Sequence, residues 1–223
     1  MNEVSKRFAV AIRGDLACFS RPELKTERVS YPIPTPSAVR GILEAILWKP
    51  AVVWRVDEIR VLKPIAYIQF RRNEVNTRMS DRTADSIRKS GDAWNYYADD
   101  DRAQRNTLAL RDVAYVVSAH MEMTARSGAE DSIRKFEEMF ERRLAKGQHV
   151  TQPALGCREF PAFVEPVGEN VQPIEHSEDL GWILHDIRFG RENEPVFFHA
   201  VMNRGVVAVP PFSDATRPQG GGE

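Results

Sequence analysis

Residues 31–50, YPIPTPSAVRGILEAILWKP, decide how the first half of the chain folds. Three prolines in the first six residues hold the backbone extended, because the proline ring fixes φ and removes a backbone donor. Thr35 is a good N-cap, Pro36 suits the first helical position, and apolar residues then recur at helical spacing. Pro50 ends the pattern, since the residue before a proline avoids the α region. The stretch predicts a short helix held at a fixed angle over a sheet.

Strand patterns lie on both sides of this helix. Residues 7–13 alternate in character as a strand does, and residues 16–19 are expected to continue it. Residues 51–70 form a long β-type run whose alternation breaks near Asp57-Glu58, which predicts a bend. Residues 108–125 form the next strand, in which Ser118 and His120 share one face.

A second helix, over residues 130–148, has an apolar stripe and a glycine stop at Gly147. Another strand follows within residues 153–167. The order β-α-β-β-α-β predicts an α+β, ferredoxin-like domain over residues 1–167, with a polar insertion at 71–106 between its second and third strands. Both helices would then cover one face of a four-stranded antiparallel sheet and leave the other face open.

The remaining residues predict a smaller unit. Residues 168–212 contain three short strand patterns separated by turns and are expected to form a small C-terminal antiparallel β-domain. Residues 213–223 end in RPQGGGE and are expected to be a disordered tail.

Charge is unevenly distributed along the chain. The 223 residues are 42% hydrophobic and carry a net charge of −1. Residues 1–78 hold 14 Lys and Arg against 8 Asp and Glu, and the rest hold 17 against 24. A basic half and an acidic half fit a polyanion contact on one side and a protein neighbour on the other. Ordinary surface variation explains the same numbers.

Two distant cysteines, Cys18 and Cys157, have no metal-ligand spacing and fit a reducing compartment. The sequence has no signal-length apolar segment and no run of about 18 apolar residues. We therefore expect a soluble, cytoplasmic protein without a membrane partner, metal or other cofactor.

Four segments together resemble a known family. They are RFAVAIRGDLACFSRPELKTERVSYPIPTPSAVRGILEAILWKP (7–50), VDEIRVLKPI (56–65), DVAYVVSAHMEM (112–123) and LGCREFPAFV (155–164). These segments resemble the CRISPR-associated RAMP superfamily, fifth Cas family, type I-C (Dvulg) variant. The resemblance implies metal-independent cleavage of the CRISPR repeat RNA at the base of its stem-loop. It also implies that the protein keeps its product and joins other subunits in the type I-C interference complex.

Such cleavage needs a base for the ribose 2′-OH, an acid for the leaving oxygen and a cation for the phosphate. His120 matches the family's catalytic histidine, although a hydrogen-bonded histidine at a strand end is the alternative. The family's tyrosine and lysine positions hold Leu47 and Ala119 here. Tyr31, Lys49, Tyr67 and Lys63 are residues of the right types to replace them, and we select Tyr31 and Lys49 as candidates. Tyr31 could instead pack or stack on a base, and Lys49 could instead interact with the helix dipole.

The candidate RNA-binding side chains are arginines, which suit phosphate and stack on unpaired bases. They are Arg40, Arg71, Arg72, Arg78 and Arg158. Basic and aromatic residues also mix within 71–106, although this segment would be a solvated loop in most proteins. Arg158 lies in a glycine-containing turn that resembles the loop RAMP proteins place near RNA, and a plain surface arginine is the alternative.

The sequence is compatible with three functions. The first is a repeat endoribonuclease, and the second is a non-catalytic subunit that holds the 5′ handle of the guide RNA. The third, a small-molecule-binding ferredoxin-like domain, has no supporting motif. Duplex DNA is a further candidate partner, since a basic face attracts any polyanion.

Overall fold

The computed structural model describes residues 3–24, 26–77, 80–91 and 97–216 of the chain. Its strands are β1 (Phe8–Ala17), β2 (Arg28–Val29), β3 (Val52–Val61), β4 (Tyr67–Val75), β5 (Arg102–Met123), β6 (Phe163–Pro166), β7 (Glu178–Arg188), β8 (Glu194–Asn203) and β9 (Val206–Ala208). Its helices are α1 (Pro36–Ile46), α2 (Asp81–Ser90) and α3 (Ile133–Ala145), with short 3₁₀ turns at η1 (Ala98–Asp101) and η2 (Phe212–Asp214).

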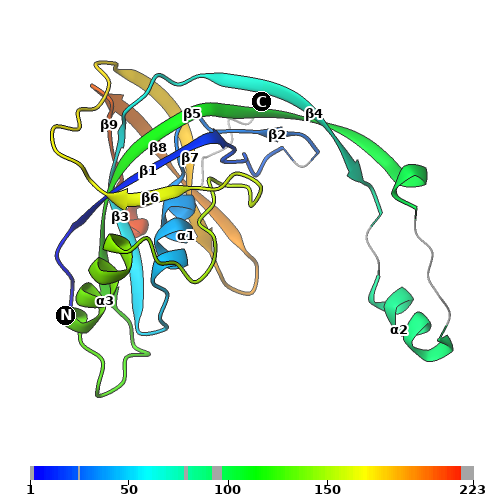
Figure 1. The fold of residues 1–223 in the computed structure, drawn as a ribbon, viewed down its shortest axis with the longest axis horizontal. Helices are drawn as coiled ribbons and strands as arrows, with labels where there is room; N and C mark the ends of the chain where they lie inside the picture. Colours follow the sequence, from blue (N-terminus) through cyan, green and yellow to red (C-terminus); the bar gives the residue numbers. More distant parts are fainter. Residues whose placement is uncertain (1–2, 25, 78–79, 92–96, 217–223) are drawn as a thin grey trace.

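The described strands form one large sheet (Figure 1). Its path runs β6-β1-β5-β3-β9-β8-β7, and β2 and β4 pair with β5 outside this path. Every strand pair is antiparallel except the two-residue pairing of β2 with β5. The protein is therefore a mixed α+β fold built on one large, mainly antiparallel sheet.

The helix α1 begins where the sequence predicted. The Thr35 hydroxyl accepts a hydrogen bond from the Ala38 amide at 3.1 Å, and Pro36 occupies the first turn. The helix ends at Ile46, and the Leu47 amide still donates to the Leu43 carbonyl at 2.9 Å. Its buried residues lie against β3 and β7. The proline-rich lead-in thus presents α1 to the sheet as expected.

The helix α3 completes the cover over the same face. Its buried Phe140 packs on Phe8 of β1 and Trp54 of β3, with ring centroids 5.0 and 4.6 Å apart. The Arg143 guanidinium donates to the Ile46 carbonyl at 2.7 Å and ties α3 to the end of α1. Aromatic packing of this kind adds to the free energy of burial. Both predicted helices therefore lie on one side of β1, β3 and β5.

The β-type run expected over residues 51–70 is two strands, so the single-strand reading was wrong. β3 ends at Val61 and β4 begins at Tyr67, with Pro64 between them. Proline cannot donate to a sheet ladder, which favours a break there. The expected bend is confirmed as a β-bulge between Val56 and Glu58.

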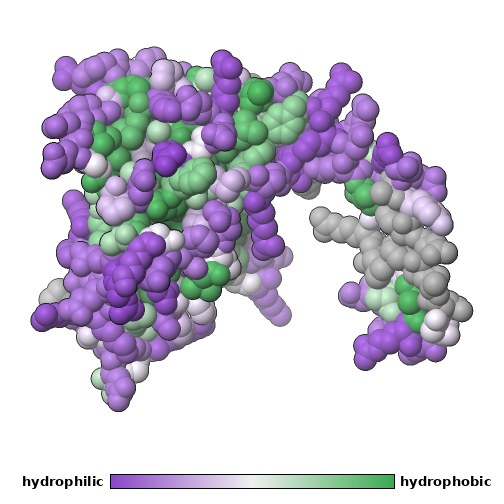
Figure 2. All heavy atoms as spheres, in the orientation of Figure 1, coloured by the Kyte–Doolittle hydropathy of each residue, from purple (hydrophilic) through white to green (hydrophobic). Residues whose placement is uncertain are grey.

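The segment expected as an insertion, 71–106, forms most of a protruding arm (Figure 1). β4 pairs with the first half of the 22-residue strand β5, and α2 lies at the far end. Ser80 caps α2, and Gly91 ends it with φ of 71°. None of the residues described in α2 is buried. Figure 2 shows the arm standing away from the body, with hydrophilic side chains along it.

The C-terminal strands continue the sheet. β9 pairs with β3 through Val206–Ala208, and β7 and β8 follow beyond it. A tight turn at Arg204 and Gly205, with φ of 47° and 74°, joins β8 to β9. A Cβ on Gly205 would lie 2.5 Å from the Ile174 carbonyl oxygen, so only glycine fits this close approach. The domain boundary after residue 167 stays a prediction.

The ordered chain extends further than the sequence suggested. Residues 213–216, which were assigned to the tail, include part of η2 and a backbone pairing of Thr216 with Phe197 of β8. Ala215 is buried. Residues 217–223 lie outside the described part of the chain.

The face of the sheet opposite α1 and α3 stays accessible. Along β5, Val117, Ala119 and Met121 are buried beneath the helices, whereas Ser118 and His120 on the other face are partly exposed. This alternation is the one the sequence predicted. Among the helices that the structure describes, none has both the length and the apolar character needed to cross a bilayer.

Candidate active site

His120 lies on the open face near the end of β5, directly opposite Arg55 of β3. Its side chain is 19% exposed, and its Nδ1 lies 3.0 Å from Asp57 Oδ2. Its Nε2 lies 3.7 Å from Glu122 Oε1, beyond hydrogen-bonding distance. One ring nitrogen is therefore held by a carboxylate, and the other has no hydrogen-bond partner in the described part of the chain.

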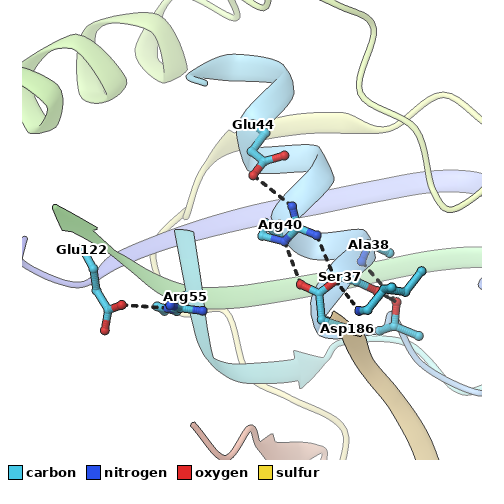
Figure 3. Close-up of polar contacts among 9 residues, drawn as sticks. Ser37, Ala38, Arg40, Glu44, Arg55, Glu122 and Asp186 are labelled. Atoms are coloured by element: carbon cyan, nitrogen blue, oxygen red, sulfur yellow. Dashed lines mark hydrogen bonds and ion pairs between the residues drawn. The ribbon is translucent and has the colours of Figure 1, made fainter. Parts of the chain in front are cut away.

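Two guanidinium groups complete the surroundings of this imidazole. The Arg7 Nε lies 3.4 Å from Asp57 Oδ2, and the Arg55 Nε donates to Glu122 Oε2 at 2.8 Å. Figure 3 shows the Arg55–Glu122 pair bridging β3 and β5. Two carboxylates and two guanidinium groups thus surround the ring, arranged for charge-assisted hydrogen bonds.

A cavity of about 570 Å³ opens beside His120, and we call it the His120 cavity. It lies between β3, α1, β7 and the segment after β9. Its charged lining residues are Arg7, Arg40, Arg55, Asp57, Glu122 and Asp186, together with His120 and His185. A volume of this size accommodates a small-molecule-sized group such as one nucleotide.

Arg40 was predicted to bind RNA, and the structure places it in the wall of this cavity. Figure 3 shows its contacts with Glu44 and Asp186. Its Nε and Nη2 both donate to the Asp186 carboxylate at 2.9 Å, and its Nη1 donates to Glu44 at 3.0 Å. This bidentate pair fastens α1 to β7. The guanidinium is therefore already engaged by two carboxylates.

His185 lies deeper in the same wall. Its Nε2–H donates to the Pro210 carbonyl at 2.8 Å, and its Nδ1 has no partner among the described residues. Burial lowers the pKa of His185, which favours the neutral ring.

Tyr31 and Lys49, the other two catalytic candidates, do not line the His120 cavity. Tyr31 is buried, with Arg21 over its ring at 4.6 Å, and burial raises its pKa to about 12. Its hydroxyl approaches the backbone of Leu184 without hydrogen-bond geometry to any described residue. Lys49 is exposed beyond the end of α1.

The other predicted RNA-binding arginines differ in whether they form ion pairs with carboxylates. Arg71 on β4 and Arg158 are exposed, and neither has an ion pair within the part of the chain that the structure describes. Arg72 forms an ion pair with Glu159 and donates to Thr107 at 3.1 Å. Arg78 lies outside the described residues.

Sequence reasoning missed Arg7, Arg55, Asp57 and Glu122 as parts of a site. The break in alternation at Asp57-Glu58 was visible, but it indicated only a bend. Asp57 and His120 are 63 positions apart, so only the pairing of β3 with β5 brings them together. A search for charged residues at strand irregularities would have selected Asp57.

The comparisons with known proteins agree with this fold. Residues 9–210 match a family described as CRISPR-associated protein (Cas_Cas5). The chain belongs to this CRISPR-associated Cas5 family. The family resemblance that the sequence motifs suggested is therefore confirmed.

Two relatives in the Cas5 family carry the same descriptive name, "CRISPR pre-crRNA endoribonuclease Cas5d". The protein from Mannheimia succiniciproducens is 46% identical over 218 residues, covering 94% of this chain and 97% of the relative. The protein from Thermus thermophilus is 42% identical over 223 residues, covering 92% and 91%.

A crystal structure of a CRISPR-associated protein shares the Cas5 chain's fold. It superposes with a TM-score of 0.72 at 23% identity, covering 96% of this chain and 97% of the other. A functionally uncharacterized protein from Streptococcus mutans superposes with a TM-score of 0.69 at 22% identity and covers 96% of each chain.

The two positions where the resemblance expects a tyrosine and a lysine are structural in this Cas5 chain. Leu47 is fully buried, and its carbonyl accepts a hydrogen bond from Trp54 Nε1 at 3.0 Å. Ala119 is fully buried on the face of β5 that packs beneath the helices. Neither position presents a polar group to the His120 cavity.

A second polar cluster joins the two cysteines, which sequence spacing did not pair. The Cys157 thiol lies 3.7 Å from the Cys18 carbonyl oxygen and 3.9 Å from Arg28 Nη1. The neighbouring Cys18 thiol, with Arg28 and Arg72, lowers the pKa of Cys157 to about 6, and the pKa of Cys18 is raised. In the described chain, no group of three or more His, Cys, Asp or Glu side chains is arranged to hold a metal ion.

Proposed function

We propose that this chain is a CRISPR pre-crRNA endoribonuclease that cleaves the repeat RNA in the His120 cavity. The observation that carries the proposal is an imidazole on an accessible sheet face, beside an open cavity and two guanidinium groups. The names of the two relatives at 46% and 42% identity support the same activity.

The reaction proposed is transesterification within the RNA backbone. The 2′-OH loses its proton and its oxygen bonds to the adjacent phosphorus, while the bond to the 5′-oxygen of the next nucleotide breaks. The products are a 2′,3′-cyclic phosphate and a 5′-hydroxyl, which takes up a proton. A group that accepts and then returns a proton near neutral pH suits these two proton transfers, and the reaction requires no metal.

We assign the proton-transfer role to His120, because its Nε2 has no hydrogen-bond partner among the described residues. Arg7 and Arg55 pair with the two carboxylates that face its ring and would stabilise the extra charge on the phosphate. Both are held by carboxylates, so RNA must compete with Asp57 and Glu122 for them. We assign no step to Tyr31 or Lys49.

RNA binding is proposed to extend well beyond the His120 cavity. Arg158 and Arg71 are exposed cations without carboxylate partners among the described residues, which leaves them available for phosphates. The arm formed by β4, β5 and α2 adds further basic side chains. We propose that these surfaces hold the stem-loop and retain the product within a type I-C complex in the cytoplasm. Duplex DNA would bind to the same cationic side chains.

The finer description of the fold is also a proposal. The order β6-β1-β5-β3, with α1 and α3 on one face, has the strand order and helix placement expected of a ferredoxin-like βαββαβ core. The strands β7, β8 and β9 would then be the C-terminal β-unit added to one edge.

A non-catalytic subunit that holds the 5′ handle of the guide RNA is the second candidate. It is favoured by the carboxylate pairing of each arginine around His120 and by the buried Leu47 and Ala119. The two candidates differ in whether the purified protein alone cuts RNA.

Incubation of the purified protein with its repeat RNA in EDTA tests this proposal. We expect His120→Ala to slow cleavage by about 100-fold or more, because general acid–base groups contribute about 10²–10⁴-fold. Binding of the RNA should change little. His176→Ala is the matched control, since His176 also contacts a carboxylate, Glu178 at 3.2 Å, but does not line the His120 cavity.

Substrate chemistry provides an independent check on the same proposal. A 2′-deoxy substitution at the cleaved nucleotide should stop the reaction, and the normal products should carry a cyclic phosphate. Full cleavage by His120→Ala, or cleavage that requires magnesium, would remove the proposed mechanism.

A further inference from the structure

We infer that Asp57 is a positioning residue for His120, set in place by the β-bulge of β3. The inference rests on the proposed function of His120. It assigns a role to a carboxylate that no sequence motif marked.

The bulge determines where the Asp57 side chain lies. Val56 pairs with Ala119, and Glu58 pairs with Ser118, so Asp57 is the extra residue between two consecutive pairs. Bulges redirect a side chain and often occur beside active sites. The Asp57 carbonyl also accepts a hydrogen bond from the Val209 amide at 2.9 Å, which anchors the bulge to the segment after β9.

The carboxylate then determines which ring nitrogen of His120 carries the proton. An ionised carboxylate only accepts hydrogen bonds, so the contact of 3.0 Å requires Nδ1–H to donate to Asp57 Oδ2. The neutral ring consequently keeps its lone pair on Nε2. That atom is the one proposed to take and return the proton of the 2′-OH.

The other charged groups around the ring do not duplicate this contact. Glu122, on β5 itself, faces Nε2 at 3.7 Å and is engaged by Arg55 of β3 at 2.8 Å. Arg40 of α1 and Asp186 of β7 are paired with each other across the cavity. His185 of β7 is directed to Pro210.

The competing explanation is that Asp57 exists to pair with Arg7, which precedes β1. The Arg7 side chain is 75% exposed and its contact is longer, at 3.4 Å. Solvent screens such a pair, which typically contributes little to stability. The His120 and Asp57 side chains are only 19% and 20% exposed, so their hydrogen bond is the better shielded of the two.

The test combines a double-mutant cycle with a spectroscopic measurement on the full chain. The variants are Asp57→Asn, Asp57→Glu, His120→Ala and the Asp57→Asn/His120→Ala double variant. Glu58→Gln is the matched control, because Glu58 is the next residue and pairs with Arg60 instead. Cleavage of repeat RNA in EDTA gives kcat and KM, and ¹⁵N NMR of labelled histidine reports the His120 tautomer.

We expect Asp57→Asn to lower kcat by about 10- to 100-fold, as for other residues that orient a catalytic or ligating histidine. KM should stay nearly constant, and Asp57→Glu should recover part of kcat. In the His120→Ala background, Asp57→Asn should have no further effect. The wild-type spectrum should show the Nδ1–H tautomer, and Asp57→Asn should lose it.

Three results would overturn the inference. They are an Nε2–H tautomer in the wild-type protein, wild-type kcat in Asp57→Asn, and an equal loss of kcat in the His120→Ala background. The wild-type spectrum decides the question even when a variant fails to fold. If His120→Ala cleaves normally while Asp57→Asn loses the tautomer, the proposed catalytic role of His120 fails and the positioning contact stands.

Discussion

Replacing Gly156 with alanine should destabilise the protein much more than replacing Gly147, although both glycines have positive φ. The angles are 85° at Gly156 and 61° at Gly147. A Cβ on Gly156 would lie 2.0 Å from the Cys18 carbonyl oxygen, whereas a Cβ on Gly147 would meet nothing within 4 Å. Comparing the two alanine variants therefore separates the energetic cost of steric overlap from the cost of a positive φ.

The expected loss of stability follows from the backbone conformation and from the groups that an alanine Cβ would displace. A left-handed conformation costs an alanine about 1–2 kcal/mol at either position. At Gly156 the backbone must also shift away from Cys18. This shift strains the hydrogen bond from the Cys18 amide to the Leu155 carbonyl at 3.0 Å and that from the Leu155 amide to the Phe160 carbonyl at 2.8 Å. At about 1 kcal/mol for each lost bond, the total reaches about 3–4 kcal/mol.

Urea unfolding of both variants, followed by tryptophan fluorescence, measures the free energy of unfolding. We expect Gly147→Ala to lose about 1–2 kcal/mol and Gly156→Ala to lose about twice as much. Gly156→Ala should also weaken RNA binding, because the same loop carries Arg158. Equal losses of stability in the two variants would refute the reasoning, since steric overlap with Cys18 would then have no measurable cost.

The remaining predictions concern surface charge and thiol reactivity. Arg158→Ala should weaken RNA binding and lower the slope of log K against log salt by about one, without changing stability. Arg134→Ala on the exposed side of α3 is its control, and equal effects from both would argue against a specific contact. Alkylation of Cys157 by iodoacetamide should be half-maximal near pH 6, since its pKa is lowered to about 6, against about 8.5 for an ordinary thiol. Arg28→Ala should move that midpoint upward, as mass spectrometry of the labelled peptide would show. An unchanged midpoint would mean that Arg28 does not stabilise the thiolate.

The arginines proposed to act in cleavage and in binding differ in their ion pairs. Those around His120 are paired with carboxylates, whereas Arg71 and Arg158 are free of ion pairs among the described residues. A paired guanidinium attracts a phosphate less strongly, but it is held in a defined orientation. We therefore expect affinity to depend mainly on the free arginines and rate mainly on the His120 cavity.

Local patterns predicted α1 and α3 but missed α2, which lies within the segment expected as an insertion. Thr35 and Pro36 start α1, and the apolar stripe of α3 ends before Gly147, because caps and 3.6-residue spacing are properties of neighbouring residues. The bulge at Asp57 was visible as a break in alternation for the same reason. His120 was likewise placed correctly on the open face of its strand.

Other features depend on contacts between distant segments and had no local signal. The attachment of β9 to β3, the ion pair of Arg40 with Asp186 and the meeting of Cys18 with Cys157 all join residues far apart in sequence. The split of residues 51–70 into β3 and β4 did have a local signal, Pro64, but only the structure shows that the two strands pair with different parts of β5.

By itself, the sequence determined where α1 and α3 lie in the chain and which face of β5 carries His120, because these follow from the spacing of adjacent residues. Only the tertiary structure decided what surrounds that histidine. Asp57, Arg7 and Arg55 reach it through the antiparallel pairing of β1 and β3 with β5, and a one-residue change in that register would turn each side chain to the opposite face.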